Sequence, residues 1–276
     1  MQTIKLPQIL TPANPVVNAE FRHQRFIIQR GRVGWIWIIL AGVMVLPALL
    51  IALAYTLAGL LLPVVESAAQ VMDLAAGTMP SWLWLGIMTV AMYPVVTLIT
   101  FALAANSVRR EKSGFTWDYL RLTQLDPEQI VIGKWWASLR ALNGDHGMVM
   151  ILRLGMSAAF VIEFSQINLI SSEPFTIWGF MILLSAITAL YSFLDAGLTA
   201  ALGITGAMVD IGGPIVPFLL FSTRVFTAFV AFLLWIATLF AMQIGIGFVL
   251  LLTILGCVGY MLVIWLVLRI AQRLVG

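Results

Sequence analysis

Charged residues are scarce in this sequence. It has 276 residues, of which 15 are Lys or Arg and 12 are Asp or Glu, so 10% are charged while 62% are hydrophobic. Soluble domains carry about 25% charged and about 45–50% apolar residues. The composition therefore excludes a water-soluble enzyme of this size, because too few charges remain to cover its surface.

Cysteine and histidine are nearly absent. The single cysteine, Cys257, lies in an apolar segment, which excludes a disulfide framework and a cysteine-based metal site. His23 and His146 lie in polar stretches outside the apolar runs, which excludes a bis-histidine haem inside a membrane. We therefore expect no cofactor, no metal ion and no catalytic residue. The polar residues 1–32 also predict that no cleavable signal peptide is present.

Four long segments contain no charged residue, namely 33–62, 81–106, 174–194 and 225–268. A helix needs roughly 20 apolar residues to cross about 30 Å of hydrocarbon, because each residue rises about 1.5 Å. The sequence therefore predicts an all-α membrane protein with six transmembrane helices in a single domain, residues 1–276. The predicted spans are 33–61, 81–106, 147–165, 175–207, 213–241 and 245–268.

The basic residues lie on one side of the predicted bundle. Residues 1–32, 107–146 and 269–276 hold 13 of the 15 Lys and Arg, and the segments on the opposite side hold none. Cytoplasmic loops are enriched in Lys and Arg. We therefore expect a multi-pass protein of the bacterial inner membrane with both termini in the cytoplasm. The net charge of +3 then reflects orientation, and no nucleic-acid partner is expected.

Residues 15–32, directly before the first span, have the periodicity of an amphipathic helix. The polar face consists of Asn18, Arg22, Arg25, Gln29 and Arg32, and the apolar face of Val16, Val17, Phe21, Ile27 and Ile28. This pattern predicts a helix in the membrane interface, with Arg22, Arg25 and Arg32 toward anionic lipid headgroups. The alternative is a short basic segment that only fixes the topology.

Residues 107–146 are longer than a turn between two spans requires. Pro127, with Asp126 before it and Gln129 after it, is typical of a capped helix start. We expect this helix to end at a break over Asn143–Gly147. Before it, Phe115–Leu122 predicts a short helix with apolar side chains available for contact. Such side chains favour docking to a protein partner or packing against the chain's own bundle, and the pattern does not decide between the two.

Two segments, Asn14–Arg32 and Arg110–Trp135, resemble type-2 ABC exporter permeases. The second segment resembles the family in a Glu-rich turn, a Thr-x-x-x-Leu pattern, a Thr-Pro-Leu-like turn and an Ile-x-x-Gly-Lys ending. The residues in register are Glu111, Thr116, Leu120, Thr123, Leu125, Ile130, Gly133 and Lys134. The sequence departs from the family in Gln124, where proline is usual, and in the Asn143–Gly147 insertion.

The resemblance implies the membrane-spanning permease subunit of an ATP-driven exporter. Its partners would be an ABC-type ATPase subunit, a second permease chain (identical or different) and membrane lipids. The expected coupling segment contains Glu111, Phe115, Thr116, Trp117, Leu120, Leu122, Leu125, Gly133 and Lys134, and residues 15–32 would be the elbow helix. No Walker A motif is present, since Trp135 follows Gly133-Lys134, so ATP hydrolysis is expected on the partner chain rather than on this one.

Two charged residues fall deep in predicted spans. Asp195 and Arg224 lie on consecutive spans, each about 16–18 Å from the cytoplasmic end by helical rise. Intramembrane charges are costly unless paired or hydrated, so the two are expected to form a buried ion pair or to line a polar path. Arg153, near the start of its span, is expected to extend toward the interface, and Glu163 to be hydrated near the outer end.

An intramembrane enzyme is disfavoured because no span contains a histidine or an Asp-x-x-x-Asp pair. An ion-coupled transporter would need several carboxylates at mid-membrane, and only Asp195 qualifies. The main alternative is a permease-like anchor subunit of a larger membrane complex that transports nothing. The sequence does not select a substrate.

Overall fold

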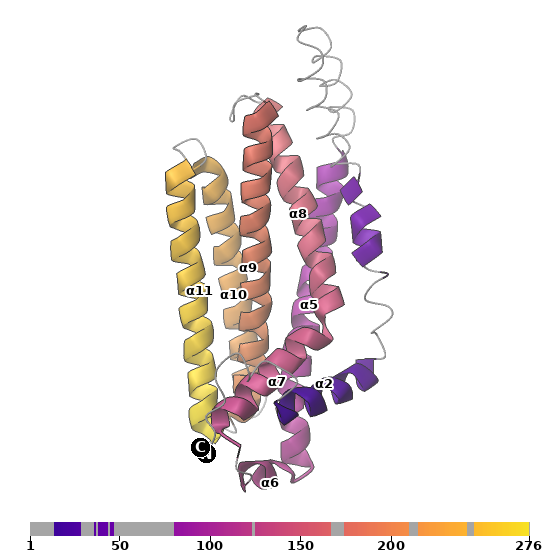
Figure 1. Ribbon diagram of the computed structural model, residues 1–276, viewed down its shortest axis with the longest axis vertical. Helices are drawn as coiled ribbons and strands as arrows, with labels where there is room; N and C mark the ends of the chain where they lie inside the picture. Colours follow the sequence, from indigo (N-terminus) through magenta and orange to yellow (C-terminus); the bar gives the residue numbers. More distant parts are fainter. Residues whose placement is uncertain are drawn as a thin grey trace, which may run out of the picture.

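The computed structural model describes residues 14–28, 36, 38–43, 45–46, 80–122, 125–166, 174–209, 215–241 and 246–275. Within these residues the chain is helical apart from short connections (Figure 1). The helices are α2 (Pro15–Ile28), α5 (Pro80–Ser113), α6 (Trp117–Leu122), α7 (Pro127–Ala141), α8 (Asn143–Gln166), α9 (Pro174–Met208), α10 (Ile215–Ala241) and α11 (Ile246–Val275). Helical residues at 38–43 and 45–46 belong to the predicted first span, the rest of which lies mostly outside the described residues.

Among the described residues, three helices are long and apolar enough to cross a membrane. They contain Leu85–Ser113 of α5, Trp178–Met208 of α9 and Gly247–Val275 of α11. Figure 1 shows these helices upright beside one another, with α8 and α10 among them. The prediction of an all-helical, multi-pass membrane protein is confirmed at this level. α10 contributes a shorter apolar stretch, Phe218–Ala231.

α9 lies at the centre of the bundle and packs against α5, α8, α10, α11 and α7. Small residues let its backbone approach its neighbours, as is common between helices in membranes. At Gly203, an added Cβ would lie 2.6 Å from the backbone oxygen of Phe101 and 3.0 Å from the Cβ of Ala104. Only glycine therefore permits the observed approach of α9 to α5.

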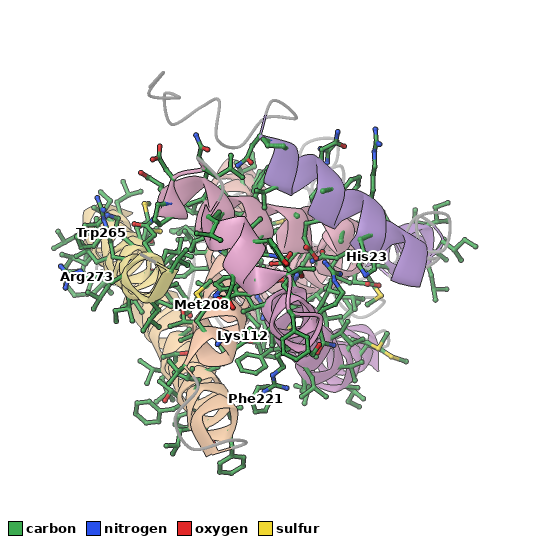
Figure 2. The ribbon with its side chains drawn as sticks, turned by 90° about the horizontal axis from the view of Figure 1, so that it is seen from below. His23, Lys112, Met208, Phe221, Trp265 and Arg273 are labelled. Atoms are coloured by element: carbon green, nitrogen blue, oxygen red, sulfur yellow. The ribbon has the colours of Figure 1, made fainter. Side chains whose placement is uncertain are left out.

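Three shorter helices lie at one end of the bundle. α7 and α2 pack against each other and cross beneath the upright helices, and α6 lies beyond them (Figure 1). Seen from this end in Figure 2, Lys112 lies beside Met208, and its Nζ donates to the Met208 carbonyl oxygen at 2.9 Å. A cation at the C-terminus of α9 interacts favourably with the helix dipole. We call this region the junction end.

The boundary between α7 and α8 differs from the prediction. The expected break over Asn143–Gly147 is wrong, because these residues form the first turn of α8 and the helix is interrupted only at Leu142. Asn and Asp favour the first turn of a helix, so polar residues here start a helix instead of ending one. α7 does begin at Pro127 as expected, but Asp126 makes no capping hydrogen bond with its side chain.

Candidate functional site

An exposed apolar patch lies at the junction end, where α5 turns into α6. Phe115 is 81% exposed, Tyr119 74% and Leu122 83%. The turn is closed by hydrogen bonds from Gly114 N to Arg110 O and from Thr116 N to Glu111 O, both 2.9 Å. Phe115 has a φ of 56°, a conformation that is unfavourable for a bulky residue. The tight turn thus holds an aromatic side chain outward; Phe115, Tyr119 and Leu122 form what we call the exposed patch.

Other residues of the predicted coupling segment point into the protein. Trp117 is 8% exposed and belongs to the main hydrophobic core, against which Leu120 and Leu125 also pack. Thr116 is exposed, and its hydroxyl donates to the carbonyl oxygen of Glu111 at 3.3 Å. α6 therefore has two faces. Trp117 and Leu120 face the core, and Tyr119 and Leu122 face outward, where a partner could contact them.

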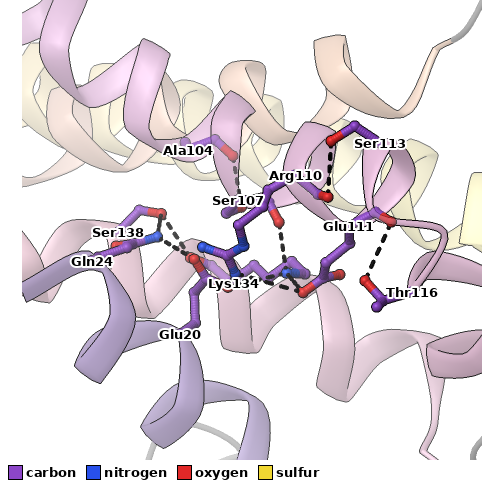
Figure 3. Close-up of polar contacts among 10 residues, drawn as sticks. All are labelled: Glu20, Gln24, Ala104, Ser107, Arg110, Glu111, Ser113, Thr116, Lys134 and Ser138. Atoms are coloured by element: carbon purple, nitrogen blue, oxygen red, sulfur yellow. Dashed lines mark hydrogen bonds and ion pairs between the residues drawn. The ribbon is translucent and has the colours of Figure 1, made fainter. Parts of the chain in front are cut away.

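Lys134 of α7 is fully buried at the centre of an ionic cluster (Figure 3). Its ammonium lies 2.7 Å from Glu111 Oε1 on α5 and 3.2 Å from Glu20 Oε2 on α2. It also donates to the carbonyl oxygen of Ser107 at 2.9 Å. Arg110 contacts the same Glu20 oxygen at 3.0 Å. Two cations and two carboxylates balance, which is the condition under which charges are tolerated in a protein interior.

Further polar contacts tie α2 to α7. Gln24 donates to Glu20 Oε1 at 2.9 Å and to Ser138 Oγ at 3.2 Å, and Asn14 donates to the carbonyl oxygen of Gln129 at 3.1 Å. An added Cβ on Gly133 would lie 3.0 Å from the Cβ of Val16, so the two helices are in close contact there. We call the linked residues the junction cluster: Glu20, Gln24, Ser107, Arg110, Glu111, Lys134 and Ser138.

Some residues of the predicted coupling segment belong to the junction cluster or pack beside it, a structural role that the sequence pattern did not indicate. Glu111, Gly133 and Lys134 connect helices inside the protein. The sequence pattern predicts them as part of the coupling segment that contacts the ATPase. Glu20 and Gln24 were missed, although both fall on the same helical face as the buried Val16. A polar pair spaced i, i+4 within an apolar face was the available signal, because such groups need buried partners.

The predicted polar face of α2 is only partly described. Asn18 and Arg22 are exposed, as a solvent- or headgroup-facing surface requires. Arg25 belongs to α2, and its side chain lies outside the described residues, as does Arg32 entirely. The described side of α2 opposite Arg22 is buried against α7 rather than left for lipid.

Inside the bundle, the structure brings Asp195 of α9 and Arg224 of α10 together as an ion pair with an N–O distance of 2.5 Å. Arg224 is fully buried. Its Nε donates to Thr199 Oγ1 at 2.6 Å, and its Nη2 donates to the Tyr93 hydroxyl. The Tyr260 hydroxyl donates to Asp195 Oδ1 at 3.4 Å. Residues of α5, α9, α10 and α11 therefore meet around one carboxylate.

Arg153 of α8 also joins this group, so the expectation that it extends to the interface is wrong. Its Nη1 donates to Ser192 Oγ at 3.0 Å, and its Nη2 lies 3.6 Å from Asp195 Oδ2. Its guanidinium carbon lies 4.6 Å from the centre of the Tyr93 ring. A carboxylate and an aromatic face within the bundle attract the guanidinium inward. We call Tyr93, Arg153, Asp195 and Arg224 the arginine cluster.

In the described part of the chain, no three His, Cys, Asp or Glu residues lie where they could hold a metal ion together. The side chain of Glu163 lies outside the described residues. No family model, no curated protein and no solved structure matches this chain. Its function is therefore inferred from the exposed patch, the junction cluster and the arginine cluster.

Proposed function

We propose that this chain is the membrane-spanning permease subunit of an ATP-driven exporter of the bacterial inner membrane. In this proposal α8, α10 and residues 33–61 supply three spans in addition to α5, α9 and α11. α8 and α10 run beside the three long apolar helices (Figure 1), which supports the extension to six. The basic residues 1–32, 107–146 and 269–276 support a cytoplasmic location for both termini and for the junction end.

The observation that carries the proposal is the exposed patch. Phe115, Tyr119 and Leu122 are the kind of large apolar side chains that anchor protein interfaces, and they are exposed on α6 and the hydrogen-bonded turn before it. If the junction end is cytoplasmic, lipid does not cover them, so a protein partner is the expected cover. A separate ATPase is the proposed partner, since the chain has no Walker A motif of its own.

The contacts of α7 support a route from the patch into the membrane. Lys134 ties α7 to the end of α5, from which α6 follows directly. The Trp135 Nε1 donates to the Gly197 carbonyl oxygen of α9 at 2.8 Å, and α7 continues through Leu142 into α8. A displacement of α6 by a moving ATPase would therefore shift α7, α8 and α9 together. Two of these helices, α8 and α9, carry Arg153 and Asp195 of the arginine cluster.

The test changes the patch without touching the core. We expect Tyr119→Asp with Leu122→Asp to remove the ATPase that co-purifies with the tagged chain in mild detergent, because two charges would be buried at the interface. Trp117 is unsuitable, since its buried side chain holds the core. The matched control, Asn18→Asp with Asn143→Asp, adds two charges at exposed positions of α2 and α8. Full ATPase recovery with the patch variant would contradict the proposal.

The same purification separates the exporter from the anchor subunit. The junction cluster would also suit a docking platform that transports nothing, because its hydrogen bonds link α2, α5 and α7. An exporter brings down an ATP-hydrolysing chain whose recovery depends on the exposed patch. An anchor brings down other membrane chains and no patch-dependent ATPase activity.

A further inference from the structure

Arg224 has its charge paired and four of its five N–H donors directed at partners within the bundle. Its guanidinium pairs with Asp195 Oδ1 and donates to the Tyr93 hydroxyl. Its Nε donates to Thr199 at 2.6 Å, and its Nη1 donates to Thr227 at 3.3 Å. The side chain is fully buried. Asp195 and Arg224 therefore form a neutral pair that needs no additional partner.

Arg153 contacts the same carboxylate, but most of its N–H donors have no acceptor among the described residues. Among the described residues, its guanidinium makes one hydrogen bond, to Ser192, and one ion pair, with Asp195 at 3.6 Å. A guanidinium has five N–H donors. Its side chain is 19% exposed, in contrast to the fully buried Arg224. The Tyr93 ring beneath it holds it in position. Arg153 is thus fixed and accessible, with donors that the described residues leave unused.

The three charged residues of the arginine cluster carry a net charge of +1. Asp195 lies about 26 Å along α9 from Trp178 and about 20 Å from Met208, so the cluster is near the middle of that span. The acidic residues of α8, Asp145 and Glu163, lie about 12 and 15 Å from Arg153 along the helix axis. Excess positive charge at this depth is costly, and an anion would remove the cost.

We infer that Arg153, beside the Asp195–Arg224 pair, binds a singly charged oxyanion. A guanidinium presents parallel N–H groups that match two oxygens of a phosphate or carboxylate. The oxyanion is the phosphate of a lipid headgroup or a free phosphate, and both present this chemistry. The inference adds a ligand class to the proposed exporter, and the binding itself requires neither ATP nor an ATPase.

The test uses the purified full-length chain in two arms. In the lipid arm, native mass spectrometry compares retention of phosphatidylglycerol with that of diacylglycerol, which lacks the phosphate, offered in equal amounts. In the small-anion arm, thermal unfolding in a lipid-free neutral detergent is compared in sodium phosphate and in sodium chloride at equal ionic strength. We expect an anion preference that Arg153→Gln weakens about tenfold or more, as loss of a charge-assisted hydrogen bond implies. Arg153→Gln leaves the neutral Asp195–Arg224 pair in place.

The control Arg109→Gln removes the same charge from an exposed position of α5 and should keep the preference. A preference in the lipid arm alone identifies a headgroup, and one in the phosphate arm alone identifies a free anion; both support the inference. No preference in either arm overturns it, and so does a preference that Arg153→Gln retains in full. Loss of ATPase co-purification would leave these results unchanged, so the two proposals fail separately.

A second measurement does not depend on the folding of a variant. Phenylglyoxal modifies accessible arginines, and peptide mass spectrometry reports the rate at each site. In the unsubstituted protein, the anion that gave a preference should slow modification of Arg153 but not that of Arg109. Equal rates with and without the anion at Arg153 would overturn the inference.

Discussion

At the residue scale, Lys134 shows how a buried charge is made tolerable. Its ammonium group contacts carboxylates from two other helices and a backbone carbonyl, and none of its surface is exposed. Burial removes the hydration of the cation, and contacts with Glu20 and Glu111 replace it. The three residues come from α2, α5 and α7, so the ion pairs depend on the relative positions of these helices.

Removal of the Lys134 charge should therefore destabilise the junction end. In Lys134→Met, Glu20 and Glu111 would remain buried with Arg110 as the shared cation, at a cost of about 3–5 kcal/mol. We expect a clearly lower midpoint of thermal unfolding in detergent and faster proteolysis after α6. Arg109→Gln, at an exposed position, should change stability by less than about 0.5 kcal/mol. An unchanged midpoint for Lys134→Met would show that the cluster does not hold α2, α5 and α7 together.

At the residue scale, the side-chain contacts of the site could not be predicted from the sequence. The spacing of Gly133 and Lys134 was visible, but their contacts were not, because Glu20 lies 114 residues away along the chain. A family-like pattern identifies positions without saying which side chains face a partner and which face the core. Arg153 was misjudged for the same reason, since its carboxylate lies on another helix.

At the element scale, apolar length was enough to predict most helices. α9 agrees with its predicted span to within one residue at each end, whereas α5 and α11 extend past theirs by seven residues at the C-terminal end, because these helices continue into the polar region after the apolar stretch ends. The sequence predicts the break between α7 and α8 over Asn143–Gly147, whereas the interruption lies at Leu142. The position of the interruption depends on tertiary packing, since the Leu142 side chain is buried.

The contact of α5 with α9 should depend on Gly203. Gly203→Ala would place a Cβ 2.6 Å from a backbone oxygen, so the helices must separate, at a cost of about 1–3 kcal/mol. The matched control is Gly179→Ala in the same helix, where no atom lies within 4 Å of the added Cβ. That variant should be neutral or more stable by about 0.5–1 kcal/mol, since alanine favours helix. Thermal unfolding of both variants in one detergent measures the difference, and equal midpoints would contradict the close contact.

At the scale of the whole molecule, charge and apolarity are segregated along the bundle. Apolar side chains cover the upright helices. The ionic junction cluster lies at the junction end, where α2 and α7 meet the end of α5 (Figure 3). This segregation could be predicted from composition, because long charge-free runs and basic connections alternate along the sequence. The convergence of five helices on the arginine cluster could not, since it depends on how the helices pack in three dimensions.

The orientation of the molecule can be measured with single cysteines. Cys257 is buried, so it should react little with a membrane-impermeant maleimide in the folded protein. Tyr119→Cys is exposed at the junction end and should react only after the cells are opened, because the basic segments are expected in the cytoplasm. Ser171→Cys, in the predicted outer connection 166–174, should react in intact cells. Labelling of Tyr119→Cys in intact cells would place the exposed patch outside, where no ATPase could reach it, and would remove the physical basis of the exporter.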